Sequence, residues 1–326
     1  MTSRFNIYTL AGACLAATMT IGAQAQEFPT RPVKITSSFS VGAGPDVALR
    51  LVADKLSKKW NQPVIVENKP GANGFIAVEA GKRARPDGYE LVQMDAAQMV
   101  TQPFLFKNLP YDLLTDFEPV TPIFRNYFFI VVPTASPYKN VGDLVNAAKA
   151  KPDSINYGSW MVGSPAHYGT AMLEDATGAK MTHIPYKDIG GLYVAVGNNE
   201  VDWAFGSAGS AGPMYRAGRV RYLAVSAPVR DAAFPDVPTV AESGGPAGFE
   251  LSSWVSLVAP KGTPKAVVEK IQKDVADIMQ DPEVRERYAT MFYEPYALNS
   301  AQFHQLLKTD TDRIGATLKR LNISLD

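Results

Sequence analysis

Short apolar runs alternate with longer amphipathic stretches along most of this chain. The runs at 33–36, 64–67 and 89–94 are apolar or β-branched, and each lies beside a turn that contains glycine or proline. The stretches 47–60 and 75–84 instead repeat apolar residues at three- and four-residue spacings. The first pattern is typical of strands and the second of helices. We therefore expect an α/β fold in which helices cover both faces of a parallel sheet.

The same alternation continues to the C-terminus. Further helices are expected at 141–150, 166–177, 192–196 and 264–279 and from near 300, and further strands at 156–159, 183–186, 201–205 and 223–226. The two strongest strands, 127–132 and 253–258, bracket the middle third of the chain. We expect one lobe from 26–125 plus 254–326 and a second from 126–253, with a hinge at the two crossings. A single continuous domain is the alternative.

The first 25 residues follow a different pattern. Arg4 precedes a mostly apolar stretch from 7 to 21, and the segment then ends in Ala23, Gln24 and Ala25. This order is typical of a secretory signal peptide, so we expect cleavage after Ala25 and a periplasmic mature protein. The only cysteine, Cys14, lies inside the apolar stretch, which leaves a lipoprotein as the less favoured alternative.

The balance of acidic and basic residues limits the classes of partner that we expect the chain to bind. The 32 basic and 32 acidic residues become 31 and 32 once Arg4 is removed with the signal peptide. A chain so balanced has no electrostatic reason to bind nucleic acid or an anionic membrane. No later apolar run reaches about 18 residues, so we expect a soluble mature protein.

The candidate binding chemistry begins in a glycine-rich turn at 37–46. This turn follows the first expected strand and opens the first expected helix. The first N–H groups of a helix have no partner within the helix, and the helix dipole adds positive charge at that end. Such a turn is suited to bind an anion.

Motifs in a fixed order identify a family resemblance. The matching segments are 28–33, 64–72, 86–89, 108–112, 116–120, 183–187, 217–221, 235–242 and 259–264. With them the chain resembles the periplasmic solute-binding proteins of tripartite tricarboxylate transporters (TTT), the Bug-type receptors. The resemblance implies two Rossmann-like lobes joined by two crossing strands, in a type II-like periplasmic binding protein architecture. It also implies a carboxylate in the cleft between the lobes and delivery to the membrane subunits of a TTT transporter.

The resemblance also implies which residues hold the ligand, through backbone amides and bridging waters of two facing loops. One loop comprises Phe39, Ser40, Val41, Gly42, Ala43 and Gly44, and the other comprises Trp160, Met161, Val162, Gly163, Ser164 and His167. Two strand ends complete the expected site, namely Met94, Asp95, Ala96 and Ala97, and Phe205, Gly206 and Ser207.

This chain departs from the usual family pattern at several of these positions. Pro45 replaces a hydroxyl residue and removes one N–H donor, and Asp46 is expected to stabilise the helix start rather than to touch an anion. Trp160, Met161 and Val162 stand where small polar residues are usual. We therefore expect an aromatic carboxylate or dicarboxylate, such as terephthalate, rather than citrate or an amino acid.

Several of these side chains have a second interpretation. Met94 and Phe205, at strand ends, belong either to an apolar wall of the site or to the core. His167 either donates to the ligand or is structural. Arg125 and Lys187 are the basic residues considered for a second carboxylate, and a surface or interlobe role is favoured for both.

Other functional classes fit less well. The turn at 42–47 has Val47 where a dinucleotide-binding motif needs its third glycine, and the chain contains no Gly-x-Ser-x-Gly. Three scattered histidines and the absence of cysteine from the mature chain argue against a zinc site. We expect a monomeric receptor that is not an enzyme and has no cofactor or metal. A sensor that presents its ligand to a signalling partner uses the same fold and stays open, as does a receptor for aliphatic di- or tricarboxylates.

Overall fold

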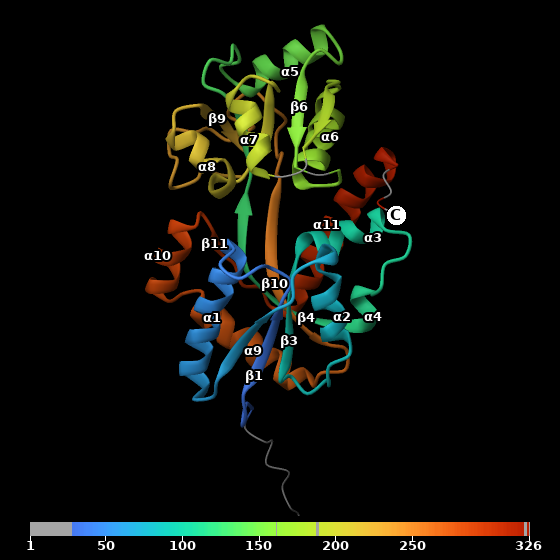
Figure 1. The fold of residues 1–326 in the computed structure, drawn as a ribbon, viewed down its shortest axis with the longest axis vertical. Helices are drawn as coiled ribbons and strands as arrows, with labels where there is room; N and C mark the ends of the chain where they lie inside the picture. The colour runs from blue at the N-terminus through green and yellow to red at the C-terminus, as the bar shows by residue number, and fades with distance from the viewer. Residues whose placement is uncertain (1–27, 161, 187–188, 323–324, 326) are drawn as a thin grey trace, which may run out of the picture.

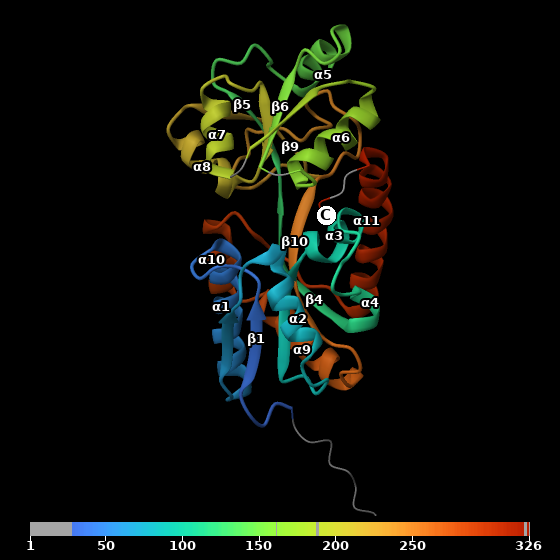
Figure 2. The ribbon, with the colours of Figure 1, turned by 45° about the vertical axis from the view of Figure 1, so that its right-hand side comes forward.

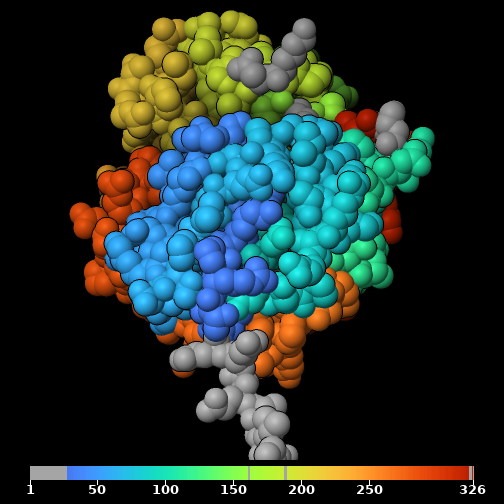
Figure 3. Space-filling model, turned by 60° about the horizontal axis from the view of Figure 1, so that its bottom comes forward, coloured from blue at the N-terminus to red at the C-terminus, as the bar shows by residue number. Residues whose placement is uncertain are grey.

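The computed structural model describes residues 28–160, 162–186, 189–322 and 325. The expected signal peptide with its cleavage site after Ala25, and also Met161 and Lys187, therefore lie outside the described residues. Two lobes are stacked along the long axis, each built around one sheet (Figure 1). The first and last parts of the chain share the lower lobe, and the middle part forms the upper lobe (Figure 3). This arrangement is the expected two-lobe α/β fold.

The sheet of the lower lobe has six strands and mixed directions. In spatial order they are β11 (Glu294–Pro295), β4 (Phe117–Tyr127), β10 (Ser252–Pro260), β3 (Glu90–Asp95), β1 (Val33–Ser37) and β2 (Val64–Asn68). The strands β1, β2 and β3 pair in parallel, as expected, whereas β10 is antiparallel to both β3 and β4. The expectation of a parallel sheet is thus only partly correct, because β10 enters from the upper lobe in the opposite direction.

Both faces of the lower sheet are covered. On one face, Ile35 and Leu257 pack with helices α1 (Gly44–Trp60), α9 (Lys265–Ile278) and α10 (Pro282–Thr290). On the other face, Val92 and Val258 pack with α2 (Phe75–Lys82) and α11 (Ser300–Leu321). Short helical segments complete this lobe, namely η1 (Ala72–Gly74), η2 (Ala97–Thr101), α3 (Gln102–Leu105) and α4 (Leu113–Asp116). The helix α10 is not expected from the sequence pattern.

The sheet of the upper lobe has five strands. In spatial order they are β7 (Thr182–Pro185), β6 (Asn156–Ser159), β8 (Trp203–Gly206), β5 (Phe129–Pro133) and β9 (Val220–Val225). The helices of this lobe are α5 (Val141–Ala150), α6 (Pro165–Thr177), α7 (Ile189–Gly197) and α8 (Ala208–Arg216). Here too only part of the sheet is parallel, because β5 runs antiparallel to β8 and β9.

The chain crosses between the lobes at Phe128 and at Leu251. These two residues are joined by a hydrogen bond of 3.3 Å from the Phe128 N–H to the Leu251 carbonyl. The expected single strand at 127–132 is in fact β5, and it follows the much longer β4, which the sequence pattern does not predict. Pro119 and Pro122 explain the omission, since proline normally excludes a central strand. Both prolines pair with β10 beside register irregularities, where a missing N–H donor is tolerated.

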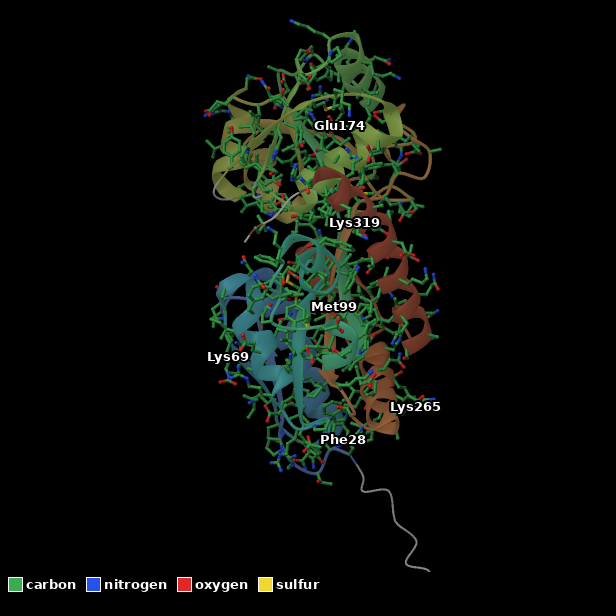
Figure 4. All side chains as sticks on the ribbon, turned by 90° about the vertical axis from the view of Figure 1, so that its right-hand side faces the viewer. Phe28, Lys69, Met99, Glu174, Lys265 and Lys319 are labelled. Atoms are coloured by element: carbon green, nitrogen blue, oxygen red, sulfur yellow. The ribbon has the colours of Figure 1, made fainter. Side chains whose placement is uncertain are left out.

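The C-terminal helix α11 touches both lobes. It starts at Ser300 with a capping box between Asn299 and Gln302, and it lies along one side of the lower lobe (Figure 2). Lys319, near its end, lies at the level of the junction between the lobes (Figure 4). Arg320 forms a 2.6 Å ion pair with Asp175 of α6. Along the stretches that the structure describes, no helix is both long enough and apolar enough to span a bilayer.

Candidate functional site

The turn after β1 is held largely by its own hydrogen bonds. Gly42 has a φ of 80°, which suits glycine, and its N–H donates to the Asp46 carboxylate at 2.8 Å. The Ala43 N–H donates to the Ser40 carbonyl at 3.1 Å. Two of the amides expected to bind a ligand are therefore engaged within the turn.

Asp46 connects this turn to the next loop. Its carboxylate is fully buried and accepts hydrogen bonds from Arg50 Nε at 3.0 Å and Asn68 Nδ2 at 2.6 Å. Burial by itself raises the pKa of Asp46, but the hydrogen bonds from Arg50, Asn68 and Gly42 together lower it below its usual value. As expected, Asp46 stabilises the helix start, and it does so through a network that the local sequence does not reveal.

The tip of the turn is open to solvent. Ser40 is exposed, and Val41 is 74% exposed although it is apolar. Phe39 is half-buried and packs against the core of the lower lobe. Gly44 lies against the Tyr293 hydroxyl, where a larger residue would clash. The turn thus presents one apolar side chain, Val41, fully to solvent.

The end of β3 separates into core and accessible positions. Met94 is completely buried, so the core interpretation is correct and Met94 is not part of an apolar wall. Ala96 is buried and Ala97 half-buried. Asp95 is half-buried and forms a capping box with Gln98: the Gln98 N–H donates to Asp95 Oδ1 at 2.9 Å, and the Asp95 N–H donates to Gln98 Oε1 at 3.0 Å.

The loop of the upper lobe lies over the hinge. Trp160 is half-buried, and its ring stacks on Phe128 with centroids 6.1 Å apart. Val162 is also half-buried. A Cβ on Gly163 would lie 2.7 Å from Leu105 of α3, so this loop already touches the lower lobe. The structure therefore brings the second expected loop to the junction of the lobes.

His167 of α6 holds this loop in place through a hydrogen bond. The Gly163 N–H donates to His167 Nδ1 at 3.0 Å, which requires a neutral ring with its proton on Nε2. The ring stacks on His183 at a centroid distance of 4.0 Å. Burial, with a smaller contribution from His183, lowers the pKa of His167 to about 4. Through Nδ1, His167 thus holds the loop and occupies the Gly163 amide, and its ligand-binding role stays a prediction for Nε2.

The remaining expected residues have mixed roles. Phe205 is completely buried beside Trp203 and Phe249, so it belongs to the core and not to the wall. Gly206 is buried, and the Ser207 hydroxyl caps α8 by accepting the Ser210 N–H at 3.1 Å. Ser164 begins α6, but its Oγ is buried and has no hydrogen-bond partner among the described residues. Of these hydroxyls, Ser164 alone is left for a ligand.

A cavity of about 500 Å³ lies near the hinge, between the loop at 227–233 and the segment from α10 to β11. It includes none of the expected site residues, although Tyr293 forms part of its wall and also touches Gly44. Arg125 lines it too, in a two-point contact with Glu294 at 2.7 and 2.8 Å. Arg125 is therefore engaged in an ion pair within the lower lobe, and of the two roles that the sequence favours, surface or interlobe, no contact among the described residues supports the interlobe one.

Sequence reasoning missed two residues at the junction of the lobes. Phe128 supports Trp160 from the hinge, and Gln98 completes the cap of Asp95. The order Asp-x-x-Gln at 95–98 is a readable capping signal, whereas nothing local indicates the contact between Phe128 and Trp160. No cluster of three or more metal-ligating side chains occurs in the part of the chain that the structure describes.

Comparison with known proteins relates this geometry to a family. Residues 48–323 match the family described as "Tripartite tricarboxylate transporter family receptor" (TctC). The chain is 32% identical to the "UPF0065 protein in gbd 5'region" of Cupriavidus necator, over 99% of this chain and 97% of that protein.

Two solved structures agree with this match. "R. palustris Rpa4515 with adipate" superposes with a TM-score of 0.76 at 27% identity, covering 91% of this chain and all of that one. The periplasmic binding protein BugD has a TM-score of 0.70 at 30% identity, covering 91% of this chain and 99% of that one. The chain therefore belongs to the TTT family receptors of the Bug type, which are periplasmic solute receptors for carboxylates and not enzymes.

Proposed function

We propose that this receptor binds an aromatic or otherwise apolar carboxylate between its lobes and delivers it to the membrane subunits of a TTT transporter. The observation that supports this most directly is the position of Trp160. Its ring lies on Phe128 at the hinge and is only half-buried, so part of it is accessible to a ligand. An aromatic side chain at such a place can bury on the order of 150–250 Å².

Other accessible apolar side chains support an apolar ligand body. Val41 is 74% exposed at the tip of the lower turn, and Val162 is half-exposed beside Trp160. Covering these side chains with an apolar body contributes roughly 25 cal/mol for each Å² removed from water. A short, fully polar acid would leave these apolar side chains in contact with water.

The charged end of the ligand is expected at the helix starts. Both α1 and α6 begin with proline in the first turn, and both N-termini face the junction of the lobes (Figure 2). The buried Ser164 hydroxyl, which has no partner among the described residues, is our choice for a direct contact with the carboxylate. We propose bridging waters for the amides that the loops already use.

Terephthalate is the aromatic dicarboxylate whose binding we compare with that of aromatic monocarboxylates. Its second carboxylate would need a donor, and Arg125 is engaged by Glu294. An aliphatic dicarboxylate is the alternative, supported by adipate in the structure of Rpa4515. A sensory role for the loaded receptor is a further alternative, and loss of uptake when the receptor is deleted separates transport from sensing.

We also propose that the protein is exported with cleavage after Ala25, acts as a monomer, and moves about Phe128 and Leu251. The apolar segment after Arg4 supports the first proposal. The hydrogen bond between the two crossing residues supports the last. Mass spectrometry of the exported protein measures the cleavage site, and light scattering measures the oligomeric state.

A thermal-shift scan of mono- and dicarboxylates tests the proposed ligand class. A ligand that binds the folded form raises Tm by mass action, so we expect the largest shifts with benzoate-type acids. Their methyl esters should give little or no shift, because they lack the charge that the helix starts bind. Equal shifts for acid and ester would contradict the carboxylate site. Larger shifts with adipate than with every aromatic acid would favour the aliphatic alternative.

A further inference from the structure

The carboxylate of Asp95 has no cationic partner among the described residues. It lies at the carboxyl end of β3, between β1 and β10, directly before the helical segment that faces the upper lobe (Figure 2). The hydrogen bonds found for the carboxylate come from backbone N–H groups, including those of Gln98 and Ala97. No described lysine, arginine or histidine forms an ion pair with it.

The capping role does not explain the charge. Serine, threonine and asparagine cap a helix about as well as aspartate does. Burial raises the pKa of the Asp95 carboxyl above its usual value, and the backbone hydrogen bonds reduce this effect without cancelling it. An acid is thus kept at the junction of the lobes where a neutral residue would serve the fold equally well.

Asp95 also acts electrostatically on the upper lobe. Its charge acts on Tyr168 of α6, the helix that begins at the second binding loop, and on Tyr111 of the lower lobe. Tyr168 is a phenol and carries no positive charge, so it is not a counter-charge for the carboxylate. Asp95 is half-buried and has no cationic partner among the described residues, so a donor that enters between the lobes can approach its carboxylate.

We propose that Asp95 selects ligands that present a hydrogen-bond donor, rather than a second carboxylate, to the lower lobe. This inference rests on the proposed function, since it assigns the far end of the same carboxylate ligand. A hydroxyl, amino or amide group would satisfy Asp95 through a charge-assisted hydrogen bond, and a carboxylate would be repelled. The selected class is then an apolar acid with a donor at the opposite end.

Four para-substituted acids test this proposal at pH 7 by calorimetry on the mature protein. They are benzoate, 4-hydroxybenzoate, 4-methoxybenzoate and terephthalate. We expect 4-hydroxybenzoate to bind about tenfold more tightly than 4-methoxybenzoate, and terephthalate to bind most weakly. In the Asp95→Asn variant, we expect the affinity for terephthalate to rise about tenfold relative to the affinity for 4-hydroxybenzoate. Terephthalate binding to the wild type as tightly as 4-hydroxybenzoate, or a ranking unchanged in Asp95→Asn, would overturn the proposal.

Asp112→Asn is the matched control. Asp112 is also an N-cap and accepts N–H groups of Leu114 and Thr115, but it lies on an exposed helix start away from the junction. This variant makes the same chemical change and should leave the ligand ranking as it is. An equal change of ranking in both variants would show a general effect of charge and contradict the role of Asp95.

Two further measurements separate this proposal from the ligand class. If none of the benzoates binds, the aromatic proposal fails, and 6-hydroxyhexanoate compared with adipate tests Asp95 on an aliphatic chain. A preference for adipate would overturn the role of Asp95. Without any ligand, Asp95→Asn should raise Tm at pH 7, and the gain should shrink as pH falls, because the wild-type carboxyl then becomes neutral. A lower Tm for Asp95→Asn at pH 7 would show that the charge is compensated and would also overturn the proposal.

Discussion

The imidazole rings of His167 and His183 lie parallel in the upper lobe, with centroids 4.0 Å apart and planes inclined by 7°. His183 Nε2 lies 2.7 Å from Ser159 Oγ, and His167 Nδ1 accepts the Gly163 N–H. The pair therefore connects the end of β6 with the binding loop and the start of α6. Both rings need to be neutral, since a proton on either would place a charge in a buried stack.

The first prediction concerns acid stability. The pKa of His167 is lowered to about 4, so its stabilising effect is present above pH 6.5 and is lost as pH falls towards 4. His167→Asn keeps an acceptor near the Gly163 N–H and removes the titration. Between pH 7 and 4 the wild type should lose on the order of 3 kcal/mol more unfolding free energy than this variant. Parallel losses, measured by urea unfolding, would show that His167 does not titrate in this range.

A second prediction concerns Trp160. Trp160→Ala removes the aromatic face over Phe128 and should weaken binding of an aromatic acid by about 1–3 kcal/mol in calorimetry. Trp160→Phe keeps a ring at this place and should lose much less. Unchanged affinity in Trp160→Ala would remove Trp160 from the site.

A third prediction uses two glycines of the upper lobe with similar backbones. Gly163 and Gly178 have φ of 79° and 74°. A Cβ added at Gly163 would lie within 4 Å of Leu105 of the lower lobe, whereas a Cβ added at Gly178 would meet nothing within that distance. Gly178→Ala should cost about 1 kcal/mol for the left-handed backbone alone. Gly163→Ala carries the same cost and also separates the loop from α3, so it should be clearly less stable and bind ligand more weakly. Equal stability of the two variants would show that the contact with Leu105 contributes nothing.

The buried Asp46 network gives a fourth prediction. Asp46→Ala leaves the Gly42 N–H and Asn68 without their acceptor and should cost about 2–4 kcal/mol of unfolding free energy. Asp54→Ala on the same helix breaks an exposed ion pair with Lys58, and there we expect at most about 0.5 kcal/mol. Chemical denaturation of both variants checks the difference. Similar losses would mean that Asp46 acts only as a surface charge.

The sequence predicts the elements of the fold better than the contacts between them. Its periodicity gives both lobes, most helices and the start of α11. It cannot decide whether Met94 and Phe205 belong to the core or to the site, because both strands are covered on both faces and positions 91–94 and 203–206 are all buried. The proline-containing β4 is hidden for a related reason, since its bulges depend on β10, which is more than 100 residues away.

In the site too, local features can be predicted from the sequence, whereas contacts between distant residues cannot. The glycine turn and the start of α6 are local features and can be recognised in the sequence. The use of the Gly42 and Gly163 amides by Asp46 and His167 depends on side-chain placement that no spacing reveals. The bond from Asn68 to Asp46 likewise joins the end of β2 to the first turn of α1, which meet only in the folded protein.

The attachment of α11 to both lobes limits how the molecule can open. The two crossing strands alone would allow both bending and twisting of the upper lobe. The ion pair between Arg320 and Asp175 adds a third connection between the lobes on one side, and the hydrogen bond from the Leu325 N–H to the Leu105 carbonyl anchors Leu325 to α3 within the lower lobe. Opening on the side of α11 would break this ion pair, so we expect the entrance to widen on the side away from α11. A solute would then enter and leave on that same side of the molecule.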